Sequence, residues 1–177
     1  YHSLSLNGDI GVNFYLDLAD EEIAKGVCVD FTWNDKHDFV TFDSESVKDS
    51  KTGCYKATCH VCAAEMSDKI TAAITIGDDE QPFATEQYSV KDYATVIMLN
   101  REGKFSEELI TLVKTMVNYG TSAQIQFDHN TENPANGTAH YAIVKLTQDE
   151  IDSINSDVPD KDAMNAALDG RGIEYYG

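Results

Sequence analysis

The sequence has little positive charge and no long apolar run. Only 13 lysines and arginines stand against 31 acidic residues, which gives a formal net charge of −18 at pH 7. Binding to the phosphate backbone of nucleic acids requires clustered Lys and Arg side chains, and anionic lipid surfaces attract the same clusters. No apolar run approaches the roughly 20 residues of a membrane-spanning helix. We therefore expect neither nucleic-acid binding nor membrane insertion.

Signatures of catalysis are missing as well. The chain has no Gly-x-Ser-x-Gly elbow, no His-Glu-x-x-His metal helix and no phosphate-binding loop. None of the five histidines lies in a sequence motif that is typical of a catalytic base. Two carboxylates can hydrolyse a glycoside. Because the chain has 31 acidic residues, some pair of them will lie close together in any fold, so the sequence does not identify a catalytic pair. We therefore predict a protein that is not an enzyme, and keep a glycan hydrolase as an alternative.

Cysteine is scarce, with four residues at positions 28, 54, 59 and 62. Cys59 and Cys62, with His60 between them, resemble half of a zinc site, but a structural zinc site usually has two such pairs. Cys59 fits better as a small hydrophobic residue on the inward side of a strand. We expect no cofactor.

Calcium is the one ion that the sequence leaves open. Two acidic clusters, Asp78–Glu80 and Asp157–Asp162, carry the carboxylate oxygens that calcium prefers. Neither cluster has the ligand spacing or the glycine of an EF-hand loop. Solvated turns are the simpler interpretation of both clusters.

Up to about residue 88, apolar and polar residues alternate with the period of half-buried strands. The clearest run is Ile10–Leu18, which is apolar at every even position, and Asn7-Gly8-Asp9 before it forms a hairpin turn. Further strands are predicted at 3–6, 27–33, 38–42, 54–62 and 70–76, with a polar connection at 19–26 and a helical turn at 63–67. Short strands with turns between them predict an antiparallel β-sandwich.

Between Ser89 and Phe127 the apolar period changes to that of two successive helices. Ser89, with Asp92 three residues later, is a typical start for the first helix. Ser106 starts the second helix, with acidic residues next to it where the helix dipole favours them. The residues between 100 and 104, including Gly103, separate the two helices.

We thus predict a mainly β fold with α: an antiparallel β-sandwich (1–88), a helical pair packed on it (89–128) and an irregular C-terminal segment (129–177). The last residues, 172–177, have the pattern of a strand that is just beginning. Either this strand opens a second sandwich that the sequence truncates, or it pairs with another partner.

Three motifs resemble one known family. They are SLSLNGDIGVNFY at 3–15, YSVKDYA at 88–94, and LVKTMVNYG at 112–120 followed by Ala123-Gln124. In this order they are similar to a repeated extracellular module in secreted or cell-surface proteins of gut-dwelling Gram-positive anaerobic bacteria, often near dockerins or carbohydrate-active domains. The resemblance implies a secreted or cell-wall-attached protein that associates with glycans or surfaces. It assigns no catalytic or binding residues.

A candidate glycan site follows from the strand pattern. If the even residues of 10–18 point inward, the odd ones face outward, and neighbouring strands add polar residues to an outer face. A sugar ring needs an aromatic surface for its C–H face and polar groups around its hydroxyls. The predicted ligand-binding residues are Asn13, Tyr15, Asp30, Thr32, Trp33, Lys56 and His60. Trp33 ends an apolar stripe, which favours core packing, and it would be a stacking surface only if exposed at the sheet rim. An ordinary solvated face, or one covered by the helical pair, is the alternative for the other residues.

We therefore predict a non-catalytic extracellular module of the cell surface that binds or presents a polysaccharide or other glycan. The alternative is a structural or adhesive spacer that contacts another surface protein. The second alternative is a glycan hydrolase.

Overall fold

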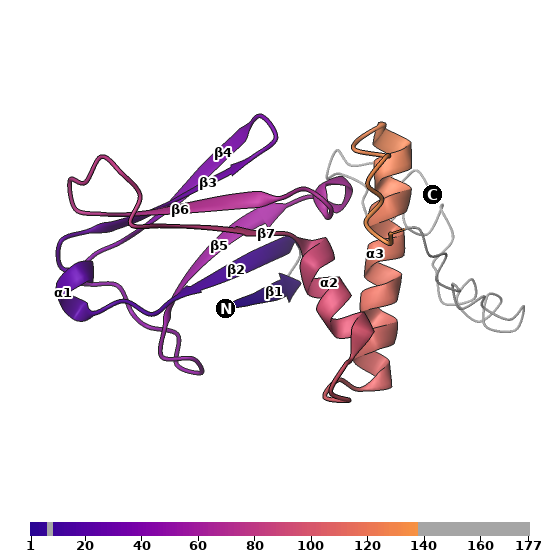
Figure 1. The fold of residues 1–177 in the computed structure, drawn as a ribbon, viewed down its shortest axis with the longest axis horizontal. Coiled ribbons are helices and arrows are strands. Elements are labelled where there is room, and N and C mark those ends of the chain that lie inside the picture. Colours follow the sequence, from indigo (N-terminus) through magenta and orange to yellow (C-terminus); the bar gives the residue numbers. More distant parts are fainter. Residues whose placement is uncertain (7–8, 138–177) are drawn as a thin grey trace, which may run out of the picture. The chain divides into compact units, whose positions relative to one another are not determined.

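The computed structural model describes residues 1–6 and 9–137. Within them the fold is mainly β with α, as predicted: two antiparallel sheets are followed by a pair of helices (Figure 1). The predicted turn at Asn7-Gly8, the acidic cluster 157–162 and the predicted strand at 172–177 lie outside the described residues.

The strands form two sheets of different size. The three-stranded sheet has the order β1 (His2–Leu6), β2 (Ile10–Leu16) and β5 (Tyr55–Val61). The four-stranded sheet has the order β4 (Lys36–Phe42), β3 (Val27–Trp33), β6 (Ile70–Ile76) and β7 (Ala84–Tyr88). All neighbouring strands are antiparallel.

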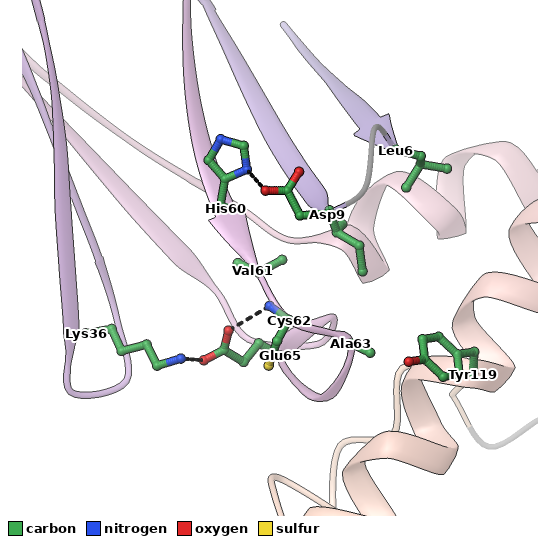
Figure 2. Close-up of a pocket in the computed structure, with 10 residues that line it drawn as sticks. Leu6, Asp9, Lys36, His60, Val61, Cys62, Ala63, Glu65 and Tyr119 are labelled. Atoms are coloured by element: carbon green, nitrogen blue, oxygen red, sulfur yellow. Dashed lines mark hydrogen bonds and ion pairs between the residues drawn. The ribbon is translucent and has the colours of Figure 1, made fainter. Parts of the chain in front are cut away.

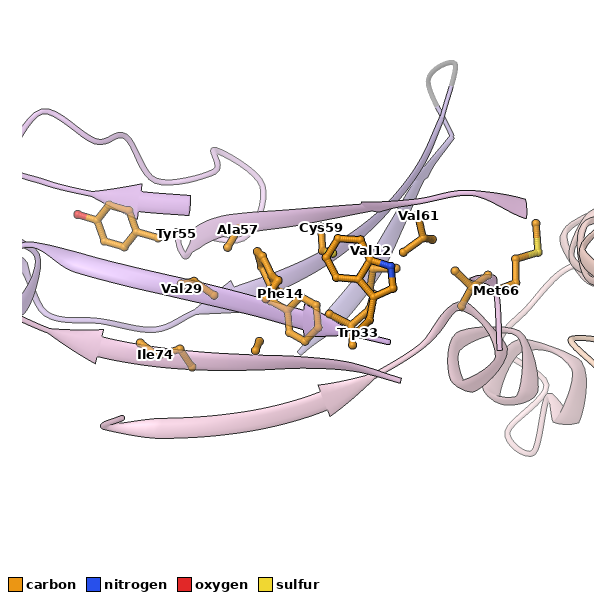
Figure 3. Packing of buried hydrophobic residues seen from close by; sticks show 14 of the residues in the cluster. Val12, Phe14, Val29, Trp33, Tyr55, Ala57, Cys59, Val61, Met66 and Ile74 are labelled. Atoms are coloured by element: carbon orange, nitrogen blue, oxygen red, sulfur yellow. The ribbon is translucent and has the colours of Figure 1, made fainter. Parts of the chain in front are cut away.

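The inner faces of the two sheets pack against each other and form the core (Figure 3). The even positions of β2 point inward as predicted, and Phe14 meets Phe31 of β3 with 5.3 Å between their ring centroids. Full burial of such a side chain stabilises the fold by about 1.5–3 kcal/mol. The other strands contribute Val29, Ala57, Cys59, Ala72 and Ile74.

Two elements differ from the prediction. The stretch predicted as a polar connection contains a short helix, α1 (Asp20–Ile23), because Ile23 reaches into the core and is only 2% exposed. Strand β7 was not predicted, because its residues are exposed from Ala84 to Gln87 and show no apolar alternation. Strand β7 is recognised only by its antiparallel pairing with β6.

The two predicted helices are confirmed together with their caps. Helix α2 (Val90–Leu99) follows Ser89, whose Oγ accepts the Asp92 N–H at 3.1 Å. Helix α3 (Glu107–Phe127) follows Ser106, whose Oγ accepts the Leu109 N–H at 3.3 Å. Each cap satisfies a backbone donor that the first helical turn leaves unpaired.

The helices lie at one end of the sandwich and do not cover a sheet face (Figure 1). Helix α3 packs on η1 (Ala63–Glu65), a 3-10 turn that follows β5, and α2 contacts β1. Gly120 permits this approach, because a Cβ there would lie 2.5 Å from Met66 Sδ and 3.2 Å from the Ala63 carbonyl oxygen. Among the described residues, both outer sheet faces are therefore left without a covering helix.

A buried polar cluster holds α3 against the sandwich. The Gln124 side chain is fully buried, and its Nε2 donates to Ser67 Oγ at 2.8 Å and to the Asn130 and Asn133 carbonyls. Its Oε1 accepts the Ala135 N–H at 2.8 Å. The side chain thus satisfies partners on both sides of the junction, which buried polar groups require.

Asp68 forms a second part of the same junction. One of its oxygens accepts a hydrogen bond from Asn34 Nδ2 at 2.7 Å and lies 2.6 Å from His129 Nε2. The other oxygen accepts a hydrogen bond from Asn130 Nδ2 at 2.6 Å. The Asp68 carboxylate therefore connects three segments: the β3–β4 turn, the loop before β6 and the segment after α3.

Replacing Gln124 should loosen this junction. Gln124→Met keeps the volume but leaves the buried Ala135 N–H without an acceptor and removes the donor to Ser67 Oγ and to two backbone carbonyls, so we expect the free energy of unfolding to fall by about 2–4 kcal/mol. Urea denaturation followed by circular dichroism measures the change. The matched control is Gln126→Met on the exposed side of α3, which should alter stability by less than about 0.5 kcal/mol. Equal midpoints for the two variants would contradict the role of the cluster.

Candidate functional site

The outer face of the three-stranded sheet collects four of the seven predicted residues. The pairing of β2 with β5 sets Tyr15 opposite Lys56, and Gly11 opposite His60, while Asn13 lies between these two pairs. Because residues two apart share a face, all four predicted residues are on the same side of this sheet.

The other three predicted residues do not join them. Asp30 and Thr32 lie on β3, which pairs with β4 and β6 in the other sheet, and Asp30 forms an ion pair with His37 of β4. Trp33 is only 7% exposed and belongs to the core (Figure 3). The expectation that Asp30 and Thr32 contribute to the same site as Tyr15 is therefore corrected by the strand pairing, and of the two interpretations of Trp33 the structure shows core packing.

Asn13 faces outward but is inaccessible, with 2% of its surface exposed. Its Nδ2 donates to the hydroxyls of Ser3 at 3.0 Å and Ser5 at 2.9 Å, and its Oδ1 accepts the Thr58 hydroxyl at 2.8 Å. These three side chains cover it. Asn13 thus orients the hydroxyls of the face instead of contacting a ligand itself.

Tyr15 forms an aromatic pair with Tyr1. The rings are stacked with 4.4 Å between their centroids and 11° between their planes. The Tyr15 hydroxyl is hydrogen-bonded to Ser3 Oγ at 3.0 Å. The backbone N–H of Tyr15 donates to the Tyr1 carbonyl at 3.0 Å. Tyr1 is 63% exposed, so this fixed pair presents an aromatic surface to solvent.

The tyrosine pair borders a groove of about 430 Å³ between β2 of the three-stranded sheet and β7 of the four-stranded sheet. Phe83, which precedes β7, adds a third aromatic ring and is 63% exposed. Asp17 and Glu86 supply carboxylates, and neither forms a salt bridge within the described residues. The groove therefore combines exposed aromatic rings with acidic groups.

His2 also lines this groove. Its ring stacks on Tyr88 with 3.9 Å between the centroids and meets Phe14 edge-on. Burial is the main cause that lowers the pKa of His2 below its usual value.

Sequence reasoning did not identify Phe83 and Glu86, because β7 carries no strand signal. An aromatic residue after Pro82, within a polar stretch, was the one hint of an exposed ring. Asp17 is an outward residue of the predicted strand 10–18, but only the structure shows that it shares a groove with Glu86.

His60 lies in a different concavity, of about 620 Å³, at the helical end of the sandwich (Figure 2). Its Nδ1 is 2.9 Å from Asp9 Oδ2, and Lys36 Nζ is 2.5 Å from Glu65 Oε1. The buried Glu65 also accepts the Cys62 N–H at 3.0 Å. Burial raises the pKa of Glu65, but hydrogen bonds from Lys36 and Cys62 outweigh it and hold that pKa below its usual value.

Cys59 is a fully buried member of the core, as predicted. Within the part of the chain that the structure describes, no group of three or more His, Cys, Asp or Glu side chains could hold a metal ion. The acidic cluster Asp78–Glu80 is exposed in the turn after β6.

Comparison with protein-family models, with curated proteins and with solved structures finds no match for this chain. The resemblance carried by the three motifs therefore stays a prediction. None of the described helices is long and apolar enough to cross a lipid bilayer.

The thiols of Cys59 and Cys62 should differ sharply in reactivity. Burial is the main cause that raises the pKa of Cys59 to about 12, whereas Cys62 is exposed. Because the thiolate is the reactive form, iodoacetamide at pH 8 should modify Cys62 in the folded protein and Cys59 only after unfolding in guanidinium. Peptide mass spectrometry locates the adducts. Modification of Cys59 at the rate of Cys62 would contradict its place in the core.

Trp33 allows a test of core packing against ligand stacking. Its Nε1 is buried without a hydrogen-bond partner in the described residues, which costs about 1–3 kcal/mol. Trp33→Ala should lower the free energy of unfolding by about 3–5 kcal/mol. Trp33→Phe should lower it by no more than about 1 kcal/mol, because the unpaired N–H disappears together with part of the apolar surface. Thermal and urea denaturation compare the two variants, and equal losses would refute this assignment.

Proposed function

We propose that this protein is a non-catalytic extracellular module of the cell surface that binds carbohydrate in the groove beside Tyr1 and Tyr15. The observation that carries the proposal is the fixed, exposed tyrosine stack at a concave surface that also holds Phe83 and two carboxylates. The hydroxyl groups of Ser3, Ser5 and Thr58 continue this surface along the sheet, held in place by Asn13.

Each part of this surface matches a need of sugar recognition. An aromatic ring offers an apolar face to the C–H side of a sugar, and its position is already fixed before binding. Carboxylates accept hydrogen bonds from sugar hydroxyls. The groove volume of about 430 Å³ falls in the range of ligand sites, roughly 300–1,000 Å³.

The extracellular location is supported by the sequence. The three motifs resemble a module of secreted or wall-attached bacterial proteins, and the net charge of −18 suits a soluble surface that meets uncharged ligands.

The alternative of an adhesive spacer is favoured by one other observation. Beyond Glu108, the only charged residue of α3 is Lys114, and the helix exposes several large apolar side chains. They are Leu112, Tyr119, Ile125 and Phe127. Exposed apolar surface of this kind marks contacts with other proteins. For a glycan hydrolase, the second alternative, Asp17 and Glu86 are the two carboxylates of the groove, and turnover of a polysaccharide would reveal such an activity.

Affinity gel electrophoresis with soluble neutral polysaccharides tests carbohydrate binding. Tyr15→Ala should weaken binding by roughly three- to tenfold, because an aromatic contact contributes about 0.5–1.5 kcal/mol. The matched control is Tyr119→Ala, which removes an exposed tyrosine of α3 outside the groove and should leave binding unchanged. Unaltered retardation of the Tyr15 variant, with its circular dichroism spectrum preserved, would contradict the proposed site.

A further inference from the structure

We propose that the groove selects glycans with free, protonated amino groups, such as oligomers of deacetylated amino sugars. This inference rests on the proposed function and adds the class of sugar that the site prefers. It follows from the charges around the groove and from the aromatic rings between them.

The groove is anionic at neutral pH. Asp17 and Glu86 line it, both are exposed, and no Lys or Arg is among its lining residues. His2 is the one described lining residue with a side chain that could become positive, and burial, together with the charge of the Tyr1 terminus, lowers its pKa. A ligand in the groove therefore meets two carboxylates, and no lysine or arginine side chain lies among the described residues that line it.

Lys48 interacts electrostatically with Asp17, but its ammonium group contacts other groups. Lys48 Nζ lies 3.1 Å from Asp20 Oδ1 and sits over the Tyr55 ring, 5.3 Å from its centroid. Its ammonium is thus shared with another carboxylate and an aromatic face. The charge of Asp17 remains available to a ligand.

The aromatic rings favour the same kind of ligand. Tyr1 and Phe83 are each 63% exposed, and the face of such a ring attracts cations as well as C–H groups. An amino sugar presents both, with an ammonium on an apolar ring face. A neutral sugar would gain ring contacts and hydrogen bonds to the carboxylates but no charge attraction, and a sugar acid would be repelled by Asp17 and Glu86.

The surrounding charge strengthens this selection. The chain carries a net charge of −18, so its overall field attracts cationic ligands and repels anionic ones. Acidic side chains are frequent on this surface, but at the groove they flank a concave aromatic surface. Asp9 and Glu102 also line concavities that hold an aromatic residue, but each forms an ion pair, with His60 and Lys104, whereas Asp17 and Glu86 form none within the described residues.

Isothermal titration with three hexasaccharides tests the proposal: glucosamine, N-acetylglucosamine and galacturonic acid oligomers, at pH 6 and low salt. The protein is the full chain with a short N-terminal tag, which keeps Tyr1 in a peptide bond and removes its terminal charge. We expect the glucosamine oligomer to bind about tenfold more tightly than its acetylated form, and this preference to shrink at high salt. The galacturonic acid oligomer should bind most weakly.

The double variant Asp17→Asn with Glu86→Gln should abolish the preference: binding of the glucosamine oligomer should fall about tenfold more than binding of the acetylated oligomer, because the new amide oxygens still accept hydrogen bonds from sugar hydroxyls but carry no charge. The control, Asp79→Asn with Glu80→Gln, removes the same charge from the exposed turn after β6 and should keep the preference. Equal affinity for the glucosamine and N-acetylglucosamine oligomers would overturn this inference while the proposed function stands. So would an equal loss of affinity for both oligomers in the double variant.

Two further outcomes separate the inference from the proposed function. If none of the oligomers binds in a way that depends on Tyr15, the proposed function itself fails. If oligolysine binds through Asp17 and Glu86 more tightly than any sugar, the groove recognises a basic peptide, and the amino-sugar proposal is overturned.

Discussion

The packing of two apolar sheet faces against each other determines what the rest of the sandwich surface presents. Because Phe14 turns inward to meet Phe31, its neighbours Asn13 and Tyr15 must face outward. A shift of one residue along β2 would exchange the core face with the outer face. The outward placement of Tyr15 is therefore a direct consequence of the core, and its stack on Tyr1 and its hydrogen bond to Ser3 orient the ring.

Local signals in the sequence predicted most of the elements, while long-range pairing decided which residues meet. The alternation over 10–18 and the serine caps of the helices act over a few residues, and the structure confirms them. Alternation does not reveal which sheet a strand joins, so Asp30 and Thr32 were expected near Tyr15 but belong to the other sheet. Strand β7 carries no alternation at all, and the groove it borders could not be predicted without it.

The junction with the helices explains why the outer sheet faces are open. Helix α3 is held by specific polar contacts of Gln124, together with close packing at Gly120, at one end of the sandwich. Gln124 interrupts an apolar helical stripe, and nothing in that pattern shows that its amide would be satisfied inside the protein. Because polar groups at a buried junction need matched partners, this contact fixes the position of α3 more specifically than apolar packing alone.

The two concavities show why exposed charge matters more than the number of acids. At the helical end, His60 lies beside Asp9, and Lys36 beside Glu65, so each acid there already has a partner (Figure 2). In the groove beside Tyr1, the carboxylates lie at aromatic rings and form no salt bridge in the described part of the chain. A ligand would have to break existing ion pairs at the first concavity, but it would gain new ones at the second. Of the two surfaces, the groove is therefore the one where binding a cationic sugar costs the protein least.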